Sequence, residues 1–134
     1  MLPLEDALAQ MLHQLPFPTK TETLALTEAA DRVCAEDVIS PINVPSFDNS
    51  AMDGYAVRLA DLQQSMTLSV AGKSFAGNPF QGEWVAQSAV RIMTGAMIPE
   101  GADAVVMQEE VTVNEDGTVT FAALPKANQN IRRI

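Results

Sequence analysis

Four side chains that can bind a cation or accept a proton stand within six consecutive positions of this sequence. They are Asp48, Asn49, Ser50 and Asp53. Two carboxylates, an amide and a hydroxyl are enough to coordinate a hard cation, to act as a general base or to orient water. The same residue types also form ordinary turns, because their side chains bond to the nearby backbone. Spacing alone leaves both interpretations open, a turn and a functional site.

The neighbours of Asp53 favour the functional interpretation. Met52 and Tyr55 flank the Asp53–Gly54 pair, so we expect this carboxylate between bulky groups at the start of a strand. Partial desolvation there can shift its pKa. Gly54 has no Cβ and allows backbone or ligand atoms to come close.

A second candidate is Thr94, which precedes Gly95 where a predicted strand breaks off. Such a break can present a hydroxyl and free amide groups to an oxyanion, but it can equally be a plain loop. Arg91 and Lys73 could meet anionic oxygens, or they could be surface or strand-edge charges.

An N-terminal helix over residues 3–15 is predicted by apolar residues at helical spacing. Glu5 and Asp6 favour its N-terminus electrostatically, and Pro16 follows its end. A short strand over 22–26 and a short helix over 27–35, capped by Thr27, are expected next. The pattern over 37–39 is extended.

The rest of the chain alternates in short apolar runs separated by Gly and Pro, which is typical of β-strands. The predicted strands cover residues 54–57, 66–71, 89–93, 104–108, 110–113 and 118–121. Asn114-Glu115-Asp116-Gly117 predicts a hairpin turn between the last two strands. We therefore expect an α+β fold that is mainly β.

Composition excludes several function classes. The chain has 134 residues and a net charge of -9, which argues against a nucleic-acid partner. One cysteine, Cys34, and one histidine, His13, exclude a disulfide framework and a Cys/His zinc site. No apolar run is long enough for a membrane span and no signal peptide is evident, so we expect a cytoplasmic protein.

The eleven residues Phe47-Asp48-Asn49-Ser50-Ala51-Met52-Asp53-Gly54-Tyr55-Ala56-Val57 closely resemble the signature of the molybdopterin molybdenumtransferase family, which includes the bacterial MoeA proteins and the E domain of gephyrin. Further stretches that resemble the family are RIMTGAMIPEGADAVV at 91–106, VAGKSFAG at 70–77 and NIRR at 130–133. The resemblance covers the chain from Leu4 onward.

The resemblance implies an N-terminal fragment of an enzyme that inserts molybdate into adenylylated molybdopterin and releases AMP, assisted by Mg²⁺ or a similar divalent cation. It implies an elongated α/β linker domain, residues 1–46 and 122–134, with a compact mainly β domain, residues 47–121, inserted in it. The sequence stops without a closing turn, so we expect a truncated chain that is inactive alone. The family further implies a homodimer with an active site shared between subunits.

Carried over by position, Asp53 matches the functional carboxylate of the signature and Thr94 matches the threonine of the Thr-Gly loop. Both are expected to be catalytic, and Asp53 is also the candidate metal ligand. Ser50 and Asn49 are expected to line the substrate site. The family commonly has proline where this chain has Met97, so the Thr-Gly loop is expected to be less rigid here.

Two alternatives stay open at this stage. The chain could be a dimerisation or scaffold module of the same family, in which the N-terminal helix together with residues 33–44 forms the dimer interface. It could also be an unrelated hydrolase that uses Asp48 and Asp53 as an acid/base pair, although no nucleophile motif stands beside them.

Overall fold

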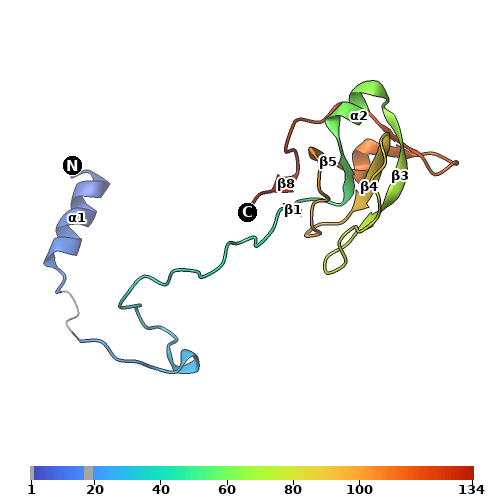
Figure 1. Ribbon diagram of the computed structural model, residues 1–134. Coiled ribbons are helices and arrows are strands. Elements are labelled where there is room, and N and C mark those ends of the chain that lie inside the picture. The colour runs from blue at the N-terminus through green and yellow to red at the C-terminus, as the bar shows by residue number, and fades with distance from the viewer. Residues whose placement is uncertain (1, 17–19) are drawn as a thin grey trace. The chain divides into compact units, whose positions relative to one another are not determined.

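The computed structural model describes residues 2–16 and 20–134. The contacts divide the chain into two compact units, residues 1–40 and 41–134 (Figure 1). Helices and strands both occur and strands predominate, which confirms the predicted α+β, mainly β class. Along the described ranges, no helix combines the length and apolarity needed to cross a membrane.

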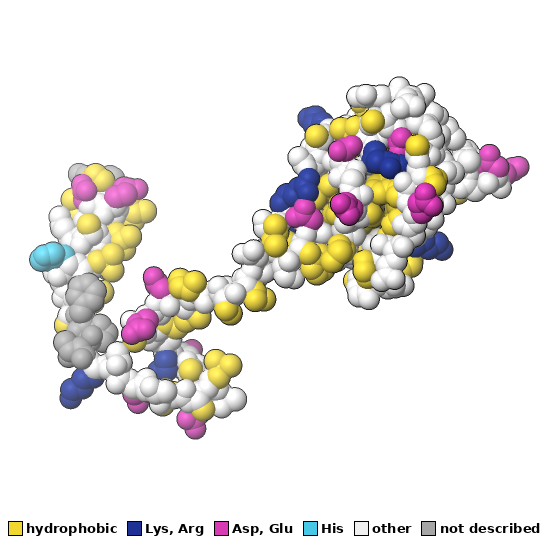
Figure 2. All heavy atoms as spheres, viewed as in Figure 1, with side chains coloured by type: hydrophobic (Ala, Val, Ile, Leu, Met, Phe, Trp, Pro, Cys, Tyr) yellow, Lys and Arg dark blue, Asp and Glu magenta, His cyan; other side chains and the backbone are white. Residues whose placement is uncertain are grey.

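The first unit begins with α1 (Leu4–Gln14), which confirms the predicted N-terminal helix. Glu5 and Asp6 lie in its first turn, where they interact favourably with the helix dipole. The helix contains no buried residue. Figure 2 shows apolar side chains on the surface of this helix. The exposed ones are Leu4, Leu8, Met11 and Leu12, and Leu15 directly after the helix is exposed as well.

Two elements predicted for the first unit are wrong. Residues 22–26 form no strand, because the described part of this unit offers no second strand to pair with. The predicted helix over 27–35 is reduced to the 3₁₀ helix η1 (Leu26–Glu28), which has no side-chain cap. Asp31 adopts a φ of 61°, a left-handed conformation that ends helical winding.

Six strands form the sheet of the second unit, in the order β5-β2-β4-β3-β7-β6. All neighbouring pairs are antiparallel except β3 and β4, which are parallel. The six predicted strands are confirmed, with small shifts of their ends. Their bounds are β2 (Gly54–Val57), β3 (Thr67–Ser74), β4 (Ser88–Ile92), β5 (Ala104–Met107), β6 (Val111–Val113) and β7 (Val119–Phe121).

The turn between β6 and β7 confirms the predicted hairpin. Asn114 N–H donates to the Thr118 carbonyl at 2.9 Å, and Gly117 adopts a φ of 82°. Glycine is suited to this left-handed position because it carries no Cβ.

Short elements that the sequence did not indicate complete the second unit. They are β1 (Asn49–Ser50), α2 (Leu59–Gln64), η2 (Gln108–Glu110) and β8 (Ile131–Arg132). β1 pairs with β8, so the end of the described chain lies against the signature segment. The expected division into a linker domain, residues 1–46 and 122–134, and an inserted domain, residues 47–121, stays a prediction. The contacts themselves divide the chain after residue 40.

The core of the second unit lies on both faces of the curled sheet, because alternate residues of a strand point to opposite sides. Tyr55 and Val57 of β2 pack on one face with Leu62, while Ala56 packs on the other with Val90. β2 is buried along its whole length. Asp53, the residue immediately before β2, is therefore attached to a fully buried strand.

Candidate active site

Asp53 is positioned by the close approach of β2 to β5. A Cβ on Gly54 would lie 1.9 Å from the Val106 carbonyl oxygen, so only glycine fits there. The Gln108 N–H donates to the Asp53 carbonyl at 3.0 Å. The backbone at Asp53 and Gly54 is thus held by β5 and by the first residue of η2, which follows it.

Thr94 stands at the corner of a β-turn that follows β4. The Ala96 N–H donates to the Met93 carbonyl at 3.0 Å, and Gly95 has a φ of 79°. A positive φ at the third position is the mark of a type II turn and favours glycine there. The turn is tied to the signature segment, because the Gly95 N–H donates to the Ser50 carbonyl at 2.8 Å. Thr94 itself is exposed.

The two predicted catalytic residues contact each other. Both the N–H and the hydroxyl of Thr94 donate to Asp53 Oδ1, each at 2.7 Å. These two hydrogen bonds hold the pKa of Asp53 below its usual value, with a further lowering from the charge of Arg91. The structure therefore brings together residues 41 positions apart and keeps the carboxylate ionised at neutral pH.

One oxygen of this carboxylate remains for a ligand. The hydrogen bonds given for the Asp53 side chain in the described structure end on Oδ1, which leaves Oδ2. Within residues 2–16 and 20–134, no three His, Cys, Asp or Glu side chains come together as a metal site. A single carboxylate still fits Mg²⁺, which commonly binds through one or two carboxylates, several waters and substrate phosphates.

The side chains of Ser50 and Asn49, the two predicted substrate-binding residues, contact the backbone of their own loop. The Ser50 side chain is fully buried, and its hydroxyl donates to the Met52 carbonyl at 2.6 Å. Asn49 donates from Nδ2 to the Phe47 carbonyl at 3.3 Å. Its Oδ1 is buried without a partner among the described residues. Both side chains shape the loop in this structure, and their role towards a substrate stays a prediction.

Asp48, the other carboxylate of the segment, is already paired. Its Oδ2 contacts the Arg133 guanidinium, and its Oδ1 accepts the Ile134 N–H at 2.9 Å. These contacts lower the pKa of Asp48, which gives it no tendency to act as a proton donor. An acid/base pair of Asp48 and Asp53 is therefore not favoured by the geometry.

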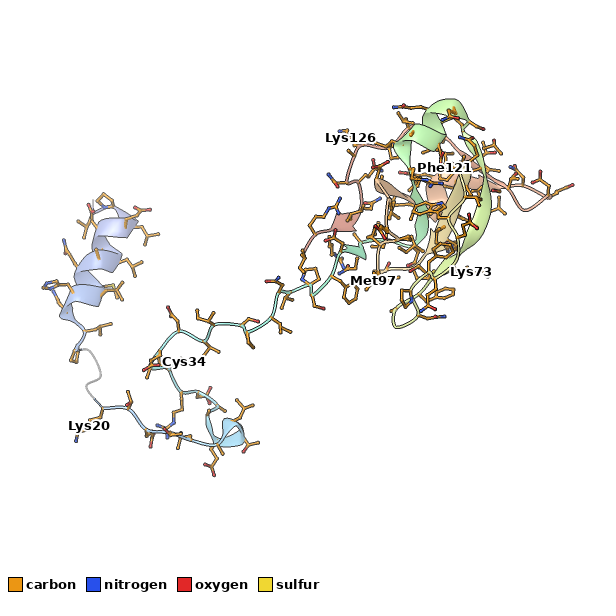
Figure 3. All side chains as sticks on the ribbon, viewed as in Figure 1. Lys20, Cys34, Lys73, Met97, Phe121 and Lys126 are labelled. Carbon is orange, nitrogen blue, oxygen red and sulfur yellow. The ribbon has the colours of Figure 1, made fainter. Side chains whose placement is uncertain are left out.

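The two candidate anion-binding side chains differ in their surroundings. Lys73 on β3 is exposed, and Figure 3 labels it there. Arg91 on β4 is half-buried and donates from Nη1 to the Gly54 carbonyl at 2.7 Å. It also contacts Gln108. The sequence pattern did not single out Gln108, because a glutamine at the end of a predicted strand gives no sign of such a contact.

Met97, which stands where proline is common in the resembling family, lies beside β1 (Figure 3). Its carbonyl accepts the Ser74 hydroxyl at 2.9 Å. The segment around it is also paired with the signature, since the Ile98 N–H donates to the Asp48 carbonyl at 3.0 Å. Hydrogen bonds from both sides thus hold the loop in place without proline.

The comparisons with known proteins agree with this arrangement. The family model for the MoeA N-terminal region (domain I and II) matches residues 2–134. The chain belongs to this family. The resemblance of the signature segment and the Thr-Gly loop is therefore confirmed.

Individual relatives show how much of a longer protein is covered. The chain is 79% identical over 134 residues to molybdopterin molybdenumtransferase of Haemophilus influenzae, covering all of this chain and 33% of that protein. It is 37% identical over 133 residues to the Bacillus subtilis protein of the same name, covering 96% of this chain and 31% of the relative.

A solved structure supports the fold. The molybdopterin biosynthesis MoeA protein from Pyrococcus horikoshii matches with a TM-score of 0.70 and 31% identity, over 98% of this chain and 34% of that one. The chain thus spans about a third of the length of the curated relatives it matches.

Proposed function

We propose that this chain is the N-terminal part of an enzyme that inserts molybdate into adenylylated molybdopterin and releases AMP, within molybdenum cofactor biosynthesis. The proposal is supported by family membership and by relatives named molybdopterin molybdenumtransferase. The main structural support is the contact between Asp53 and Thr94. Asp53 comes from the signature segment and Thr94 from the Thr-Gly loop, the two segments that resemble the family.

In this proposal Asp53 acts as a fixed anion. Thr94 donates two hydrogen bonds to Oδ1 and so orients the carboxylate, and Oδ2 is directed to a divalent cation or to a water molecule. A bound Mg²⁺ would supply positive charge at the adenylyl phosphate. Because Thr94 lowers the pKa of Asp53, a role as general base is weaker than a role in binding and orientation.

The negative charge of the chain fits an active site that needs further positively charged groups from outside residues 1–134. Molybdate and the phosphate are anions, whereas the chain carries a net charge of -9. Binding them needs a cation or basic groups outside residues 1–134. We therefore propose a homodimer of the longer protein, in a cytoplasmic setting, with the rest of the substrate site on the partner subunit. Ser50 and Asn49 are proposed to shape the substrate-facing loop.

The test compares the longer protein with this chain. Purified full-length protein is incubated with adenylylated molybdopterin, molybdate and Mg²⁺, and AMP is quantified by chromatography. We expect AMP release that depends on molybdate and on the metal, and none from residues 1–134 alone. Turnover by residues 1–134, or no molybdate-dependent release by the full-length protein, would contradict the proposal.

A second candidate function, dimerisation or scaffolding, is favoured by one observation. The apolar stripe of α1 is exposed in this chain, with Leu8 53% and Met11 66% exposed. A contiguous apolar stripe is commonly covered in the functional assembly. This observation supports an interface role for α1 beside the catalytic role of Asp53.

Two substitutions in the full-length protein separate these functions. Leu8→Asp places a charge in the stripe of α1, and Asp53→Ala removes the carboxylate. The enzyme proposal expects Asp53→Ala to abolish cofactor formation while the oligomeric state stays unchanged in light scattering. If Leu8→Asp abolishes cofactor formation and Asp53→Ala leaves it intact, the scaffold function is the correct one.

A further inference from the structure

Arg91 has a set of contacts that the proposed function does not use. Its guanidinium carbon lies 5.2 Å from the centre of the Tyr55 ring, on the neighbouring strand β2. The Tyr55 ring is buried and meets Phe121 edge to face, with centroids 6.3 Å apart. Arg91 therefore rests on a platform that the core holds in place, and a planar guanidinium stacks well on such a ring.

The donors of Arg91 are directed at the backbone next to the active carboxylate. Nη1 donates to the Gly54 carbonyl at 2.7 Å and to the Ile92 carbonyl at 3.2 Å. Nη2 donates to Gln108 Oε1. The Gln108 N–H in turn donates to the Asp53 carbonyl at 3.0 Å. Two successive carbonyls, those of Asp53 and Gly54, are thus held by two residues that are bonded to each other.

This closed set of hydrogen bonds fixes the peptide that carries the Asp53 side chain. We propose that Arg91, together with Gln108, is a positioning residue that holds the Asp53 carboxylate in register with Thr94 for the reaction. The inference rests on the proposed function for its activity test. Arg91 acts through the backbone here, because its Nη1 and Nη2 atoms already donate to protein acceptors.

The fork geometry of Arg91 makes the proposal testable. Lysine keeps the charge but cannot donate in two directions from one plane. If Arg91 positions Asp53, Arg91→Lys in the full-length protein lowers kcat for AMP release by roughly ten- to a hundredfold and leaves the KM values within about threefold. Gln108→Ala lowers kcat in the same way but less.

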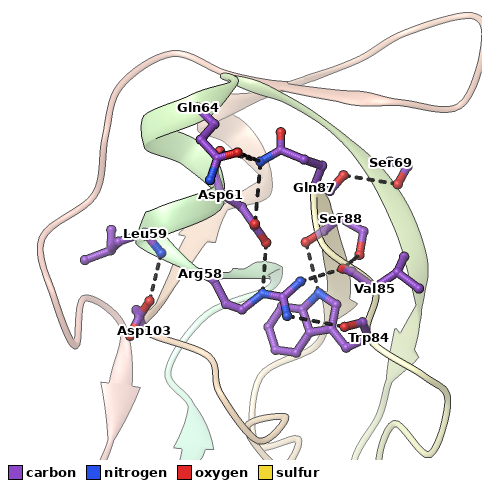
Figure 4. A network of polar contacts seen from close by, with 10 residues as sticks. All are labelled: Arg58, Leu59, Asp61, Gln64, Ser69, Trp84, Val85, Gln87, Ser88 and Asp103. Carbon is purple, nitrogen blue, oxygen red and sulfur yellow. Dashed lines mark hydrogen bonds and ion pairs between the residues drawn. The ribbon is translucent and has the colours of Figure 1, made fainter.

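Arg58 provides a matched control. It follows the opposite end of β2 and forms a comparable fork, stacking 4.7 Å from the centre of the Trp84 ring and bonding to Asp61 at 2.8 Å (Figure 4). Arg58→Lys breaks this second fork without touching the Asp53 backbone. We expect its kcat to stay within about twofold of the wild type at a temperature where all variants are folded.

A second readout does not depend on turnover. The Thr94 N–H is bonded to Asp53 Oδ1, so its hydrogen exchange reports how firmly the carboxylate is held. In the full-length protein we expect faster exchange at Thr94 in Arg91→Lys and Gln108→Ala, and unchanged exchange in Arg58→Lys.

Each other outcome overturns the inference. Unchanged kcat and unchanged Thr94 exchange in Arg91→Lys would show that the Arg91 guanidinium does not position Asp53. A raised KM with unchanged kcat would make Arg91 a substrate contact instead. Equal losses of kcat in Arg58→Lys would make the effect one of general stability. If the wild type releases no AMP, the proposed function fails by itself, and the exchange at Thr94 still decides whether Arg91 positions Asp53.

Discussion

Replacing Gly54 by alanine tests the packing that places Asp53. The added Cβ would lie 1.9 Å from the Val106 carbonyl oxygen, and 3.0 Å is the closest that real Cβ atoms come. β2 and β5 would have to separate locally by about 1 Å, since the clash is with backbone and not with a flexible side chain. Overpacking of this kind costs about 1–3 kcal/mol, and each ladder hydrogen bond that is weakened adds about 1 kcal/mol. We expect a loss of about 3 kcal/mol.

Urea unfolding of this chain, followed by the fluorescence of its single tryptophan, Trp84, measures this loss. Trp84 lies in the second unit, so the signal reports that unit. Gly101→Ala is the control, because Gly101 has a φ of 84° but nothing within 4 Å of an added Cβ. It should lose about 1 kcal/mol from backbone strain alone. A loss in Gly54→Ala no larger than in Gly101→Ala would refute the close approach of the strands.

Two further predictions concern the side chains around the site. Thr94→Val in the full-length protein removes the hydrogen bond from the hydroxyl to Asp53 and should lower the rate of AMP release by about tenfold. Thr94→Ser keeps the hydroxyl and should keep most of the activity. Equal rates in both variants would contradict this prediction. Hydrogen bonds hold the pKa values of Asp48, Asp53 and Asp116 in the folded state below the usual value of 3.8. The ionised carboxylates therefore stabilise the folded state fully above that pH. This stabilisation is lost as the pH falls through the folded-state pKa values. The urea midpoint of this chain should therefore fall between pH 5 and pH 3, and a midpoint that rises over that interval would contradict the assignment.

The β elements were predictable because their signal is local. β2 has the predicted bounds, since GYAV is a short apolar run between turn-forming residues, and the hairpin at Gly117 followed from its turn chemistry. The failures at 22–26 and 27–35 have the opposite cause. Strands need a partner and short helices need a packed face, and the described part of the first unit supplies neither.

The site was predictable in part. Asp53 and Thr94 were identified through the family resemblance, but no spacing rule states that residues 41 positions apart share two hydrogen bonds. The role of Ser50 could not be read from its type, because only the fold shows that its hydroxyl is buried against the Met52 carbonyl. Arg91 had two open interpretations, and its contact with the Gly54 carbonyl depends on strand register alone.

The most direct test of the central claim compares two isosteric substitutions in the full-length protein. Asp53→Asn removes the charge that is proposed to act on a cation or water, and Asp48→Asn removes a charge that is already paired with Arg133. Molybdate-dependent AMP release is measured under single turnover at saturating substrate. We predict a loss of about a hundredfold or more in Asp53→Asn and a far smaller loss in Asp48→Asn. Wild-type rates in Asp53→Asn, or equal losses in both variants, would contradict the account.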